Sequence, residues 1–330
     1  MKTRLLSQQD IQQVLTMKEV VEIAEKTFLG MGEGTVVNPT KVGLDLGEMA
    51  PYPPYKGFMN AMPAYVGWLD VAGIKWAGGF LDNAKIGLPY ISSMILLIDP
   101  RTGQFRVAMD GALITNLRTG AQSAVALKYL HPGPSVRLGL FGAGAQGRTQ
   151  TRAIAEVFSI ERLTVYDIRP EAAQAFAKEI APVVKGSVEV ANRPDDVPVD
   201  AQAVVCVTQS KDKYFRETWF KPGMILLPMG SYQECDDQCI LRANKIIVDH
   251  VGQCLHRGAL KELSEAGRIT ERNIHATIGE VVAGKKPGRA SPGERILCIP
   301  IGTGAMDIAV AAVAYQRAAE KGMGGEFAFV

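Results

Sequence analysis

The sequence predicts an α/β protein with two domains, and three observations support that prediction. The chain has 330 residues, whereas a single domain usually has about 100–200. From residue 135 onward, short apolar runs alternate with helical patterns, which is typical of βαβ units around a parallel sheet. Residues 36–120 instead carry short β-rich runs between Pro and Gly residues, and these predict a largely antiparallel α+β domain.

Composition and charge exclude several classes of protein. With 47% hydrophobic and 21% charged residues, the chain has enough apolar material for a sizeable core. Its 36 Lys and Arg residues nearly balance 34 Asp and Glu residues, so we expect no nucleic-acid partner. No apolar run is long enough to span a membrane, and the first residues lack the apolar segment of a signal peptide. Five cysteines are too few for a disulfide scaffold, so we expect a reducing, cytoplasmic location.

The first half of the chain begins with a helical pattern over residues 7–32. Ser7 and Asp10 are suitable N-terminal caps, and Gly30 and Gly32 are expected to end the pattern, which we interpret as two short helices. Strands, a turn and a helix are then expected, with the strands at 65–68, 74–77 and 93–98, the turn at 99–103 and the helix at 114–130.

In the second half, strands and helices are expected to alternate. The strands are predicted at 136–141, 163–167, 203–208, 224–229 and 246–249, and helices at 146–158 and 170–180. A last helical pattern at 305–321 has small residues on several faces and can pack back onto the first half. We therefore expect one discontinuous domain of residues 1–130 plus 305–330, and a second domain of residues 131–304.

The most informative motif is Gly142-x-Gly144-x-x-Gly147, which joins a predicted strand to a predicted helix. The first glycine permits a tight turn, the second lets the backbone approach a pyrophosphate, and the third lets the helix pack closely. The N–H groups at the start of the helix, around Ala145 and Gln146, can bind the phosphates. In this context the motif predicts a Rossmann-type dinucleotide-binding domain.

Asp167 ends the next predicted strand and indicates which dinucleotide binds. A carboxylate there accepts hydrogen bonds from the adenosine ribose hydroxyls and repels a 2′-phosphate, which favours NAD over NADP. Arg169 lies two residues further on and can pair with a 2′-phosphate, so NADP stays open as an alternative cofactor.

Small residues follow the next two predicted strands. Thr208 and Ser210 come after one strand, and Met229, Gly230 and Ser231 come at the end of the other. Ligands of open α/β sheets bind outside the carboxyl ends of the strands. We therefore expect these five residues to lie beside the cofactor.

The first half and the end of the chain carry the motifs of a known family. They are Lys41, Met62-Pro63-Ala64-Tyr65, Gly73-Ile74-Lys75, residues 82–89 (DNAKIGLP), residues 110–121 (DGALITNLRTGA) and residues 302–307 (GTGAMD). Together with the GAGAQG motif, they make the chain resemble the ornithine cyclodeaminase/mu-crystallin family over nearly its whole length. The resemblance implies that the discontinuous α+β domain binds substrate and forms a homodimer.

The resemblance also implies which residues surround the substrate. Arg118 would hold a substrate carboxylate bidentately. Lys75 would bind the carboxylate or the reacting nitrogen, and in a dry pocket its pKa can fall far enough to move a proton. Lys41 occupies a position where family members often carry arginine. Asp307 matches a family aspartate, either as a helix cap or facing the lysine, and we expect Lys75 and Asp307 to be catalytic.

Two further residues are expected beside the cofactor. They are Thr119, which follows Arg118, and Gly302, in the turn before the last helix. No metal is predicted, because the His and Cys residues lack the spacing of metal ligands.

One departure from the family pattern bears on the reaction. Cyclodeaminases of the family carry an acidic residue just after a strand-end Gly-Ser or Gly-Ala pair, and here that position is Tyr232. Glu234 and Asp236 follow in the same loop and are candidates to replace it. Hydride transfer needs no such residue.

We therefore expect an NAD-dependent oxidoreductase that interconverts a small L-amino acid and its imino or 2-oxo acid. It would be an amino-acid dehydrogenase or an imine reductase, with hydride transfer at Cα. Two alternatives stay open: cyclodeamination of ornithine to proline and ammonia, and non-catalytic NAD(P)-dependent binding as in the mu-crystallin branch.

Overall fold

The computed structural model describes residues 2–48, 50–230 and 232–329, which form two compact units. Unit 1 combines Met1–Arg118 with Thr303–Val330, and unit 2 is Thr119–Gly302. The first boundary falls inside helix α3 (Ala112–Leu130), whereas the sequence analysis placed it after that helix. Because one continuous helix contributes to both units, no loop marks the point where they divide.

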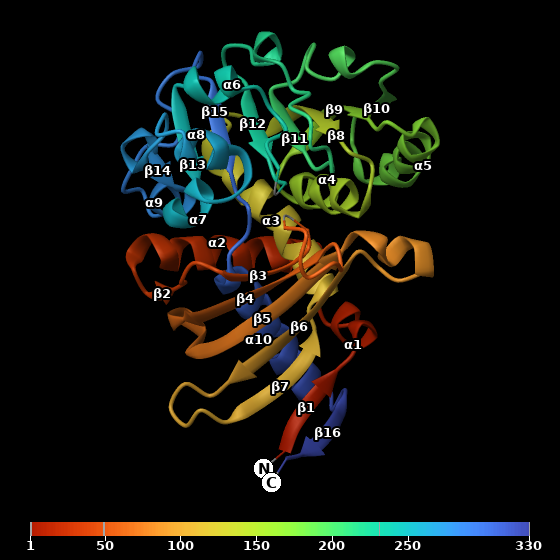
Figure 1. Cartoon of the computed structure of the whole chain (residues 1–330), viewed down its shortest axis with the longest axis vertical. Coiled ribbons are helices and arrows are strands. Elements are labelled where there is room, and N and C mark those ends of the chain that lie inside the picture. Colours follow the sequence, from red (N-terminus) through yellow and green to blue (C-terminus); the bar gives the residue numbers. More distant parts are fainter. Residues whose placement is uncertain (1, 49, 231, 330) are drawn as a thin grey trace. The chain divides into compact units, whose positions relative to one another are not determined.

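Unit 1 is built on a mixed sheet. Among the described residues it has eight strands in the order β16-β1-β7-β6-β5-β4-β2, with β3 paired to β4. The neighbours are antiparallel except β1 and β7, which are parallel. Figure 1 shows β1 and β16, from opposite ends of the chain, side by side. The strands are β1 (Lys2–Leu6), β2 (Val36–Val37), β3 (Val42–Leu46), β4 (Gly57–Val66), β5 (Val71–Phe80), β6 (Ile91–Ile98), β7 (Phe105–Asp110) and β16 (Gly325–Ala328).

Helices cover one face of this sheet. The long helix α10 (Gly304–Glu320) packs against β4, β5, β6 and α2 (Met17–Glu33), and Figure 1 shows it in blue behind the strands. A short helix, α1 (Gln8–Gln12), contacts α10 and β7. Most residues in the first half of α10 are buried alanines and aliphatic side chains, which let the helix lie close to the sheet.

Local chemistry sets the ends of the N-terminal helices. Ser7 caps α1 in a capping box with Asp10, as the sequence predicted. Helix α2 ends at Gly34, whose φ of +82° lies in the left-handed region. The prediction that Gly30 and Gly32 end the helix was wrong, because both lie buried inside it. A Cβ on Gly30 would come within 2.9 Å of a valine side chain, so this glycine permits close packing.

The antiparallel strands are longer than the sequence predicted. β4 and β5 have 10 residues each and pair along their whole length. Glycines interrupt the alternation of apolar and polar residues in this hairpin, but large side chains of the paired strands fill the space beside them. A Cβ on Gly78 would lie 2.0 Å from Met59 Sδ. The strands β1 and β16 were not predicted, because each is short and becomes a strand only by pairing with residues from the far end of the chain.

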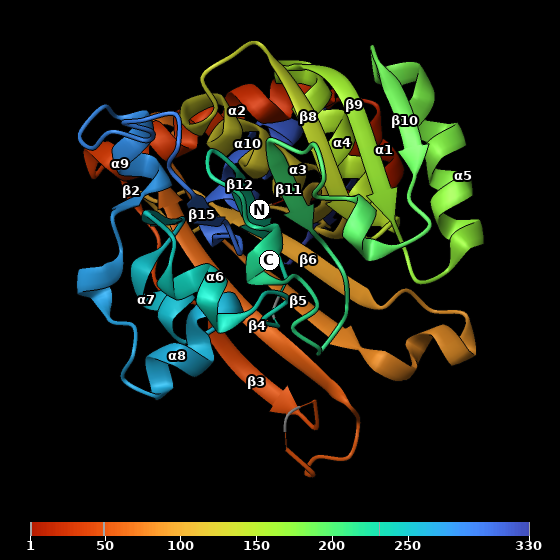
Figure 2. The ribbon, with the colours of Figure 1, turned by 90° about the horizontal axis from the view of Figure 1, so that it is seen from above.

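Unit 2 contains the predicted parallel sheet. Its strand order among the described residues is β10-β9-β8-β11-β12-β15-β13-β14, and all neighbours are parallel. Figure 2 shows β8, β9 and β10 in this order, with α5 beyond β10. The strands are β8 (Ser135–Phe141), β9 (Ser159–Tyr166), β10 (Ser187–Val190), β11 (Ala203–Cys206), β12 (Ile225–Pro228), β13 (Lys245–Val248), β14 (Ala276–Thr277) and β15 (Ile296–Ile299).

The order of the strands reverses between β8 and β11, which lie next to each other although two strands separate them in the sequence. Such a point in an open parallel sheet is where ligands bind. The helices of unit 2 beyond α3 are α4 (Ala145–Val157), α5 (Pro170–Ile180), α6 (Asp237–Leu241), α7 (Val251–Leu255), α8 (Lys261–Glu265) and α9 (Ile278–Val282). The predicted α/β fold with a Rossmann-type domain is confirmed.

Buried aromatic rings fill part of the core of unit 2. Phe141 stacks on Trp219 with ring centroids 6.2 Å apart, and Phe215 packs edge-on against both. The strands β8, β11 and β12 are buried along most or all of their length, as expected for a sheet covered on both faces.

Two searches of the described residues concern membranes and metals. No helix in residues 2–48, 50–230 and 232–329 is long and apolar enough to cross a bilayer. Within the same ranges, no three His, Cys, Asp or Glu side chains converge in a way that could hold a metal ion.

Candidate functional site

Lys75 lies on the helix-covered face of the sheet in unit 1. It belongs to β5, where side chains alternate between the two faces. Lys75 is 2% exposed, whereas the next residue, Trp76, is 58% exposed on the open face. A lysine ammonium is rarely this deeply buried without a charged partner.

The partner of Lys75 is Asp307, in the first turn of α10. Its Oδ2 atom lies 2.7 Å from Lys75 Nζ, and its Oδ1 atom accepts a hydrogen bond from Arg118 Nε at 2.9 Å. Thr115, one turn before Arg118 in α3, bridges the pair. Its Oγ1 atom lies 3.3 Å from Lys75 Nζ and 3.5 Å from Asp307 Oδ1. The structure thus brings the three predicted residues together, and Asp307 faces the lysine, while Thr303 occupies the N-cap position of α10.

Burial and neighbouring charges set the pKa values in this cluster. Burial, together with the nearby Arg118 guanidinium, lowers the pKa of Lys75 to about 8, although Asp307 opposes the change. Burial alone would raise the pKa of Asp307, but Arg118 and Lys75 outweigh it, so the pKa is lowered. Asp307 is therefore ionised near neutral pH, and Lys75 can gain or lose a proton within the physiological range.

The fourth predicted residue of this group, Lys41, lies further along the sheet. It directly precedes β3, whose Val42 pairs with Ala61 of β4, and the next residue of β4, Met62, pairs with Lys75. The register thus places Lys41 two strands away from Lys75. It is partly buried and does not share the ion pairs of Asp307.

In unit 2, the glycine motif forms the turn between β8 and α4. Gly142 has a φ of +101°, and a Cβ there would lie 2.8 Å from the Val207 carbonyl oxygen beyond β11. A Cβ on Gly147 would lie 2.3 Å from the Gly142 carbonyl oxygen, so the helix packs directly on the turn. A Cβ on Gly144, by contrast, would have no heavy atom of the described residues within 4 Å, apart from those of its two chain neighbours. This open space is what an approaching pyrophosphate needs.

The start of α4 has the matching chemistry. Gly144 is its N-cap residue and has no side chain to cap the first N–H groups, which belong to Ala145, Gln146 and Gly147. Asp167, at the end of β9, accepts hydrogen bonds from the backbone N–H groups of Ala143, at 2.9 Å, and Arg169, at 3.0 Å. The carboxylate thus lies against the glycine turn. The residues present fit a bound dinucleotide.

The predicted residues beyond β11 and β12 lie on adjacent strands. Thr208 and Met229 lie just beyond the carboxyl ends of these strands, and the Met229 N–H donates to the Cys206 carbonyl at 3.0 Å. The Ser210 N–H donates to Thr208 Oγ1 at 3.2 Å. Gly230 follows Met229 directly, and Ser231 lies outside the described residues.

Buried side chains form hydrogen bonds with the backbone of the two remaining predicted residues, Gly302 and Thr119. The Gly302 N–H donates to Asp249 Oδ2 at 2.6 Å, and the Gly302 carbonyl accepts from Gln253 Nε2 at 2.8 Å. The Thr119 carbonyl accepts from Gln150 Nε2, in α4, at 3.2 Å. The backbone at Gly302 and Thr119 is therefore anchored within unit 2.

The two acidic residues near Tyr232 have partners inside unit 2. Glu234 is fully buried and accepts hydrogen bonds from Thr208, and Asp236 accepts one from the Glu217 N–H at 3.1 Å. Tyr232 itself lies under the Lys211 ammonium, which is 5.7 Å from the centre of its ring.

The sequence analysis missed Thr115, Gln150 and the pair Asp249 and Gln253, and it named Glu234 only as a candidate to replace the family's acidic residue. Thr115 carried a usable signal, because a residue three positions before Arg118 in a helix shares its face. The others lie in strand-end loops or on a helix face, and their hydrogen-bond partners are far away in the sequence, so only the tertiary structure identifies them.

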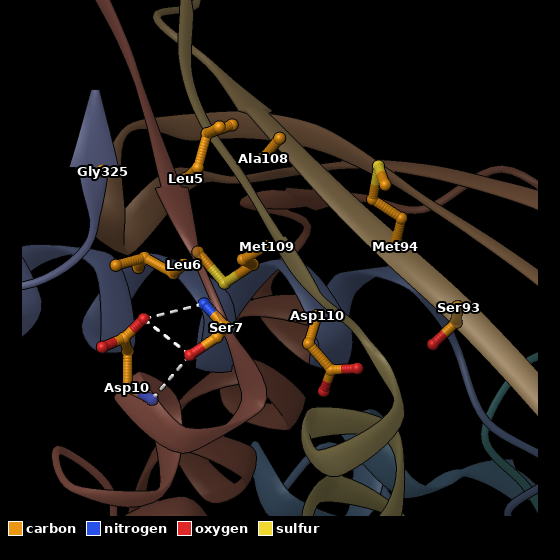
Figure 3. Close-up of a pocket in the computed structure, with 10 residues that line it drawn as sticks. All are labelled: Leu5, Leu6, Ser7, Asp10, Ser93, Met94, Ala108, Met109, Asp110 and Gly325. Carbon is orange, nitrogen blue, oxygen red and sulfur yellow. Dashed lines mark hydrogen bonds between the residues drawn. The ribbon is translucent and has the colours of Figure 1, made fainter. Parts of the chain in front are cut away.

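Unit 1 also has a separate hollow of about 570 Å³, shown in Figure 3. In that view Ser7 and Asp10 are joined by the hydrogen bonds of their capping box, and the Asp110 carboxylate lies across from them. Asp110 accepts from the Leu113 N–H at the start of α3. None of the residues predicted for the site is among those that line this hollow, and the polar groups that cap the two helices account for its carboxylates.

Comparisons with known proteins identify the family of this chain. A family model described as the ornithine cyclodeaminase/mu-crystallin family matches residues 1–322. An alanine dehydrogenase of Archaeoglobus fulgidus is 32% identical over 333 residues, which cover 100% of this chain and 99% of that protein.

Two solved structures have the same fold. An archaeal alanine dehydrogenase dimer with bound NAD superposes with a TM-score of 0.92, with 31% identity and 100% of both chains covered. The Δ1-pyrroline-2-carboxylate reductase of Thermococcus litoralis, in complex with NADH and L-proline, superposes with a TM-score of 0.90. It is 31% identical, with 98% of this chain and 99% of that chain covered.

Proposed function

Because the chain belongs to the ornithine cyclodeaminase/mu-crystallin family, we propose that it is an NAD-dependent oxidoreductase of amino or imino acids. It interconverts a small L-amino acid and its imino or 2-oxo acid, as an amino-acid dehydrogenase or imine reductase. The similar alanine dehydrogenase and pyrroline-2-carboxylate reductase support this class of reaction.

One observation carries the proposal. Two buried cationic side chains, Lys75 and Arg118, share a single carboxylate, Asp307. Buried cationic side chains are costly, and an anionic ligand stabilises them. The carboxylate of an amino or imino acid has the charge and planar shape to fill that role.

The side chains of this cluster then take distinct parts in the reaction. Arg118, whose Nε atom donates to Asp307, holds the substrate carboxylate through its guanidinium group. NADH, when bound, would supply the hydride that reduces the imine carbon. Lys75 donates the proton that the nitrogen takes up, and Asp307 holds the ammonium in place. In the reverse direction Lys75 accepts that proton, and its pKa of about 8 suits both directions. Lys41 contributes charge at the edge of the substrate region.

The dinucleotide binds at the switch point of the unit 2 sheet. Gly144 and the N–H groups at the start of α4 would hold its pyrophosphate, and Asp167 would accept hydrogen bonds from the adenosine ribose. The residues beyond β11 and β12 complete the site. NADP is the alternative cofactor, through Arg169, whose Nε atom lies 3.7 Å from the Asp167 carboxylate.

A substrate panel tests this function. NADH oxidation is followed by absorbance with 2-oxo acids plus ammonia or methylamine, and with cyclic imino acids. Net NADH consumption with one acid supports a reductase and identifies its substrate class. NADH binding without turnover across the panel contradicts catalysis and favours a mu-crystallin-like binding protein.

Ornithine cyclodeamination is the main enzymatic alternative. Here Tyr232 occupies the position of the family's acidic residue, and both Glu234 and Asp236 have partners within unit 2. These contacts disfavour either as its replacement. Proline formed from ornithine with catalytic NAD⁺, and without net NADH change, would establish cyclodeamination instead.

We also infer a homodimer formed through the open face of the unit 1 sheet. The register aligns Val42, Trp76 and Met94 in one row on that face, and all three are exposed. A second apolar hollow of about 520 Å³, which includes Ile74 and Leu96, continues the same face. Exposed apolar patches of this kind are typical of subunit interfaces.

A further inference from the structure

Glu234 is a buried carboxyl group that the proposed reaction does not use. It lies in the loop between β12 and α6 and is 0% exposed. Its hydrogen-bond donors are uncharged groups of Thr208 and Tyr214. A carboxyl group this deep in a protein is costly unless it is well hydrogen-bonded, so its contacts indicate a specific role.

One oxygen atom of Glu234 collects three hydrogen bonds. The Thr208 N–H donates to Oε1 at 2.9 Å, the Thr208 hydroxyl donates to it at 2.5 Å, and the Tyr214 hydroxyl donates to it at 3.0 Å. Thr208 lies just beyond β11, whereas Glu234 follows β12. The side chain therefore joins the loops that leave two adjacent strands.

The second oxygen, Oε2, lies beside Gly230. The Gly230 backbone lies within hydrogen-bonding reach of the Glu234 carboxyl group, and a Cβ on Gly230 would lie only 3.1 Å from Oε2. Backbone pairing adds to the connection, because the Phe215 N–H donates to the Glu234 carbonyl at 2.9 Å and the Asp236 N–H donates to the Phe215 carbonyl at 2.9 Å. The Glu234 carboxyl group thus fills the space between Thr208 and Gly230.

The position of Thr208 also bears on the glycine turn. The Val207 carbonyl oxygen, directly before Thr208, would lie 2.8 Å from a Cβ on Gly142, so the two segments are already in close contact. A shift of Thr208 would therefore move backbone that lies beside both the glycine turn and Glu234. A ligand bound at the carboxyl ends of β8, β11 and β12 contacts all three segments.

We propose that Glu234 is a positioning residue for the dinucleotide, holding Thr208 and Gly230 at the spacing that the cofactor needs. This inference rests on the proposed function, because it assumes that a dinucleotide binds in unit 2. Glu234 acts through Thr208 and does not touch the cofactor. Burial raises the pKa of Glu234, whereas its hydrogen bonds lower it. Glutamine has the same length and keeps an acceptor oxygen, so it is the conservative replacement.

The test measures NADH affinity of the full chain by fluorescence titration, beside the thermal unfolding midpoint without cofactor. E234A removes all three hydrogen bonds and raises the Kd for NADH about tenfold or more. E234Q keeps an acceptor oxygen at the same reach and restores most of that affinity. T208V removes the hydroxyl that donates to Glu234. Adding E234A to T208V should therefore raise the Kd for NADH less than E234A does in the wild type, and a double-mutant cycle measures this difference.

Gln233 provides the matched control. It is the adjacent buried residue of the same loop, but its amide donates to Asp237 Oδ1 at 2.8 Å and to the Cys235 carbonyl at 3.0 Å, away from Thr208. Q233A lowers the unfolding midpoint without changing the Kd for NADH. If E234A does not fold, E234D takes its place, because its side chain is one methylene shorter and draws the carboxylate away from Thr208. We expect E234D to raise the Kd for NADH about threefold or more.

The possible failures are distinguishable. Wild-type chain that does not bind NADH contradicts the proposed function itself. Wild-type binding with an unchanged Kd in E234A or E234D overturns the role of Glu234 and leaves the proposed function standing. An equal loss of affinity in E234A and Q233A also overturns it, because the loop would then act only through stability.

Discussion

Lys75 and Asp307 form a buried ion pair in which Nζ and Oδ2 are 2.7 Å apart. The lysine comes from the middle of a strand and the aspartate from the first turn of the last long helix. Arg118 shares the same carboxylate, so one aspartate compensates two buried cations. The stability of unit 1 and its proposed chemistry therefore depend on the same atoms.

Replacing Asp307 by Asn should destabilise the protein. The substitution leaves Lys75 and Arg118 buried without their carboxylate, and breaking a buried pair in this way costs about 3–5 kcal/mol. Urea denaturation measures the free energy of unfolding. The control is D82N, since Asp82 pairs only with exposed lysines and its loss should change stability little. Similar effects of the two variants would contradict the structural role of Asp307.

The reductive reaction should slow as pH rises through about 8, the pKa of Lys75. Above that value Lys75 has lost the proton that it donates. A profile of kcat/KM against pH for the wild-type enzyme should show this descending limb, and residual activity of K75M should lack it. A wild-type rate that stays flat across the same pH range would argue against Lys75 as the proton donor.

The same pKa makes a prediction about stability. Lys75 has a pKa of about 8 in the folded protein and 10.5 as an ordinary lysine, so between these values the unfolded chain binds more protons. The cost of burying the charged amine is full below pH 8, and the contribution of Lys75 to the free energy of unfolding rises with pH across this window. Denaturation of wild type and K75M at several pH values isolates this contribution. The free energy of unfolding of wild type minus that of K75M should rise between about pH 8 and 10.5.

Two glycines of the 142–147 turn should respond differently to alanine. At Gly144 a methyl group meets open space, so G144A should leave the unfolding midpoint nearly unchanged and weaken NADH binding. At Gly147 it would lie 2.3 Å from the Gly142 carbonyl oxygen, so G147A should lower stability by about 1–3 kcal/mol. Calorimetry and NADH titration of both variants separate these effects. Equal NADH affinity in G144A and wild type would contradict a pyrophosphate at this turn.

Asp167 should control the choice between NADH and NADPH. D167N keeps an oxygen that accepts the Ala143 N–H but removes the negative charge facing a 2′-phosphate. The ratio of the Kd for NADPH to the Kd for NADH should fall about tenfold, which corresponds to 1.4 kcal/mol. Titration with both dinucleotides checks this, and an unchanged ratio would mean that Asp167 serves only to hold the turn.

A charge on the open face of unit 1 should disrupt the proposed dimer. Trp76 is 58% exposed there, and W76E would bury a carboxylate in an apolar contact. Light scattering after gel filtration should change from dimer to monomer. V199E is the control, because Val199 is an equally exposed apolar residue of unit 2. Dissociation by V199E, or a persistent W76E dimer, would place the interface elsewhere.

The sequence predicted β8, β9, β11, β12 and β13 of the unit 2 sheet, because most of these strands are short buried apolar runs bounded by turn residues. It did not predict β10, β14 or β15. The glycine motif also located the turn at the switch point, since its three glycines meet different steric requirements. Unit 1 was harder to predict. Its strands β4 and β5 contain glycines that break the alternation, and the partner side chains that fill the gaps belong to the neighbouring strand.

In the site, too, motifs predicted individual residues, whereas contacts between residues far apart in the sequence were not predicted. Lys75, Arg118 and Asp307 were expected from motifs, and the structure adds that one carboxylate serves both cations. Glu234 was noticed only as a candidate for another residue's role. Its partner Thr208 lies 26 positions earlier, so no spacing in the sequence indicates their hydrogen bonds.

Unit 1 is made from both ends of the chain, and this affects how the protein is synthesised. A ribosome completes all of unit 2 before it makes α10 and β16. The contiguous unit can fold as it emerges, whereas the β1–β7 sheet must await its last helix. Until then Lys75 and Arg118 have no aspartate to pair with. A nascent chain that stalls before residue 303 would therefore present a finished unit 2 beside an open, apolar sheet, which is the kind of surface that chaperones and proteases bind.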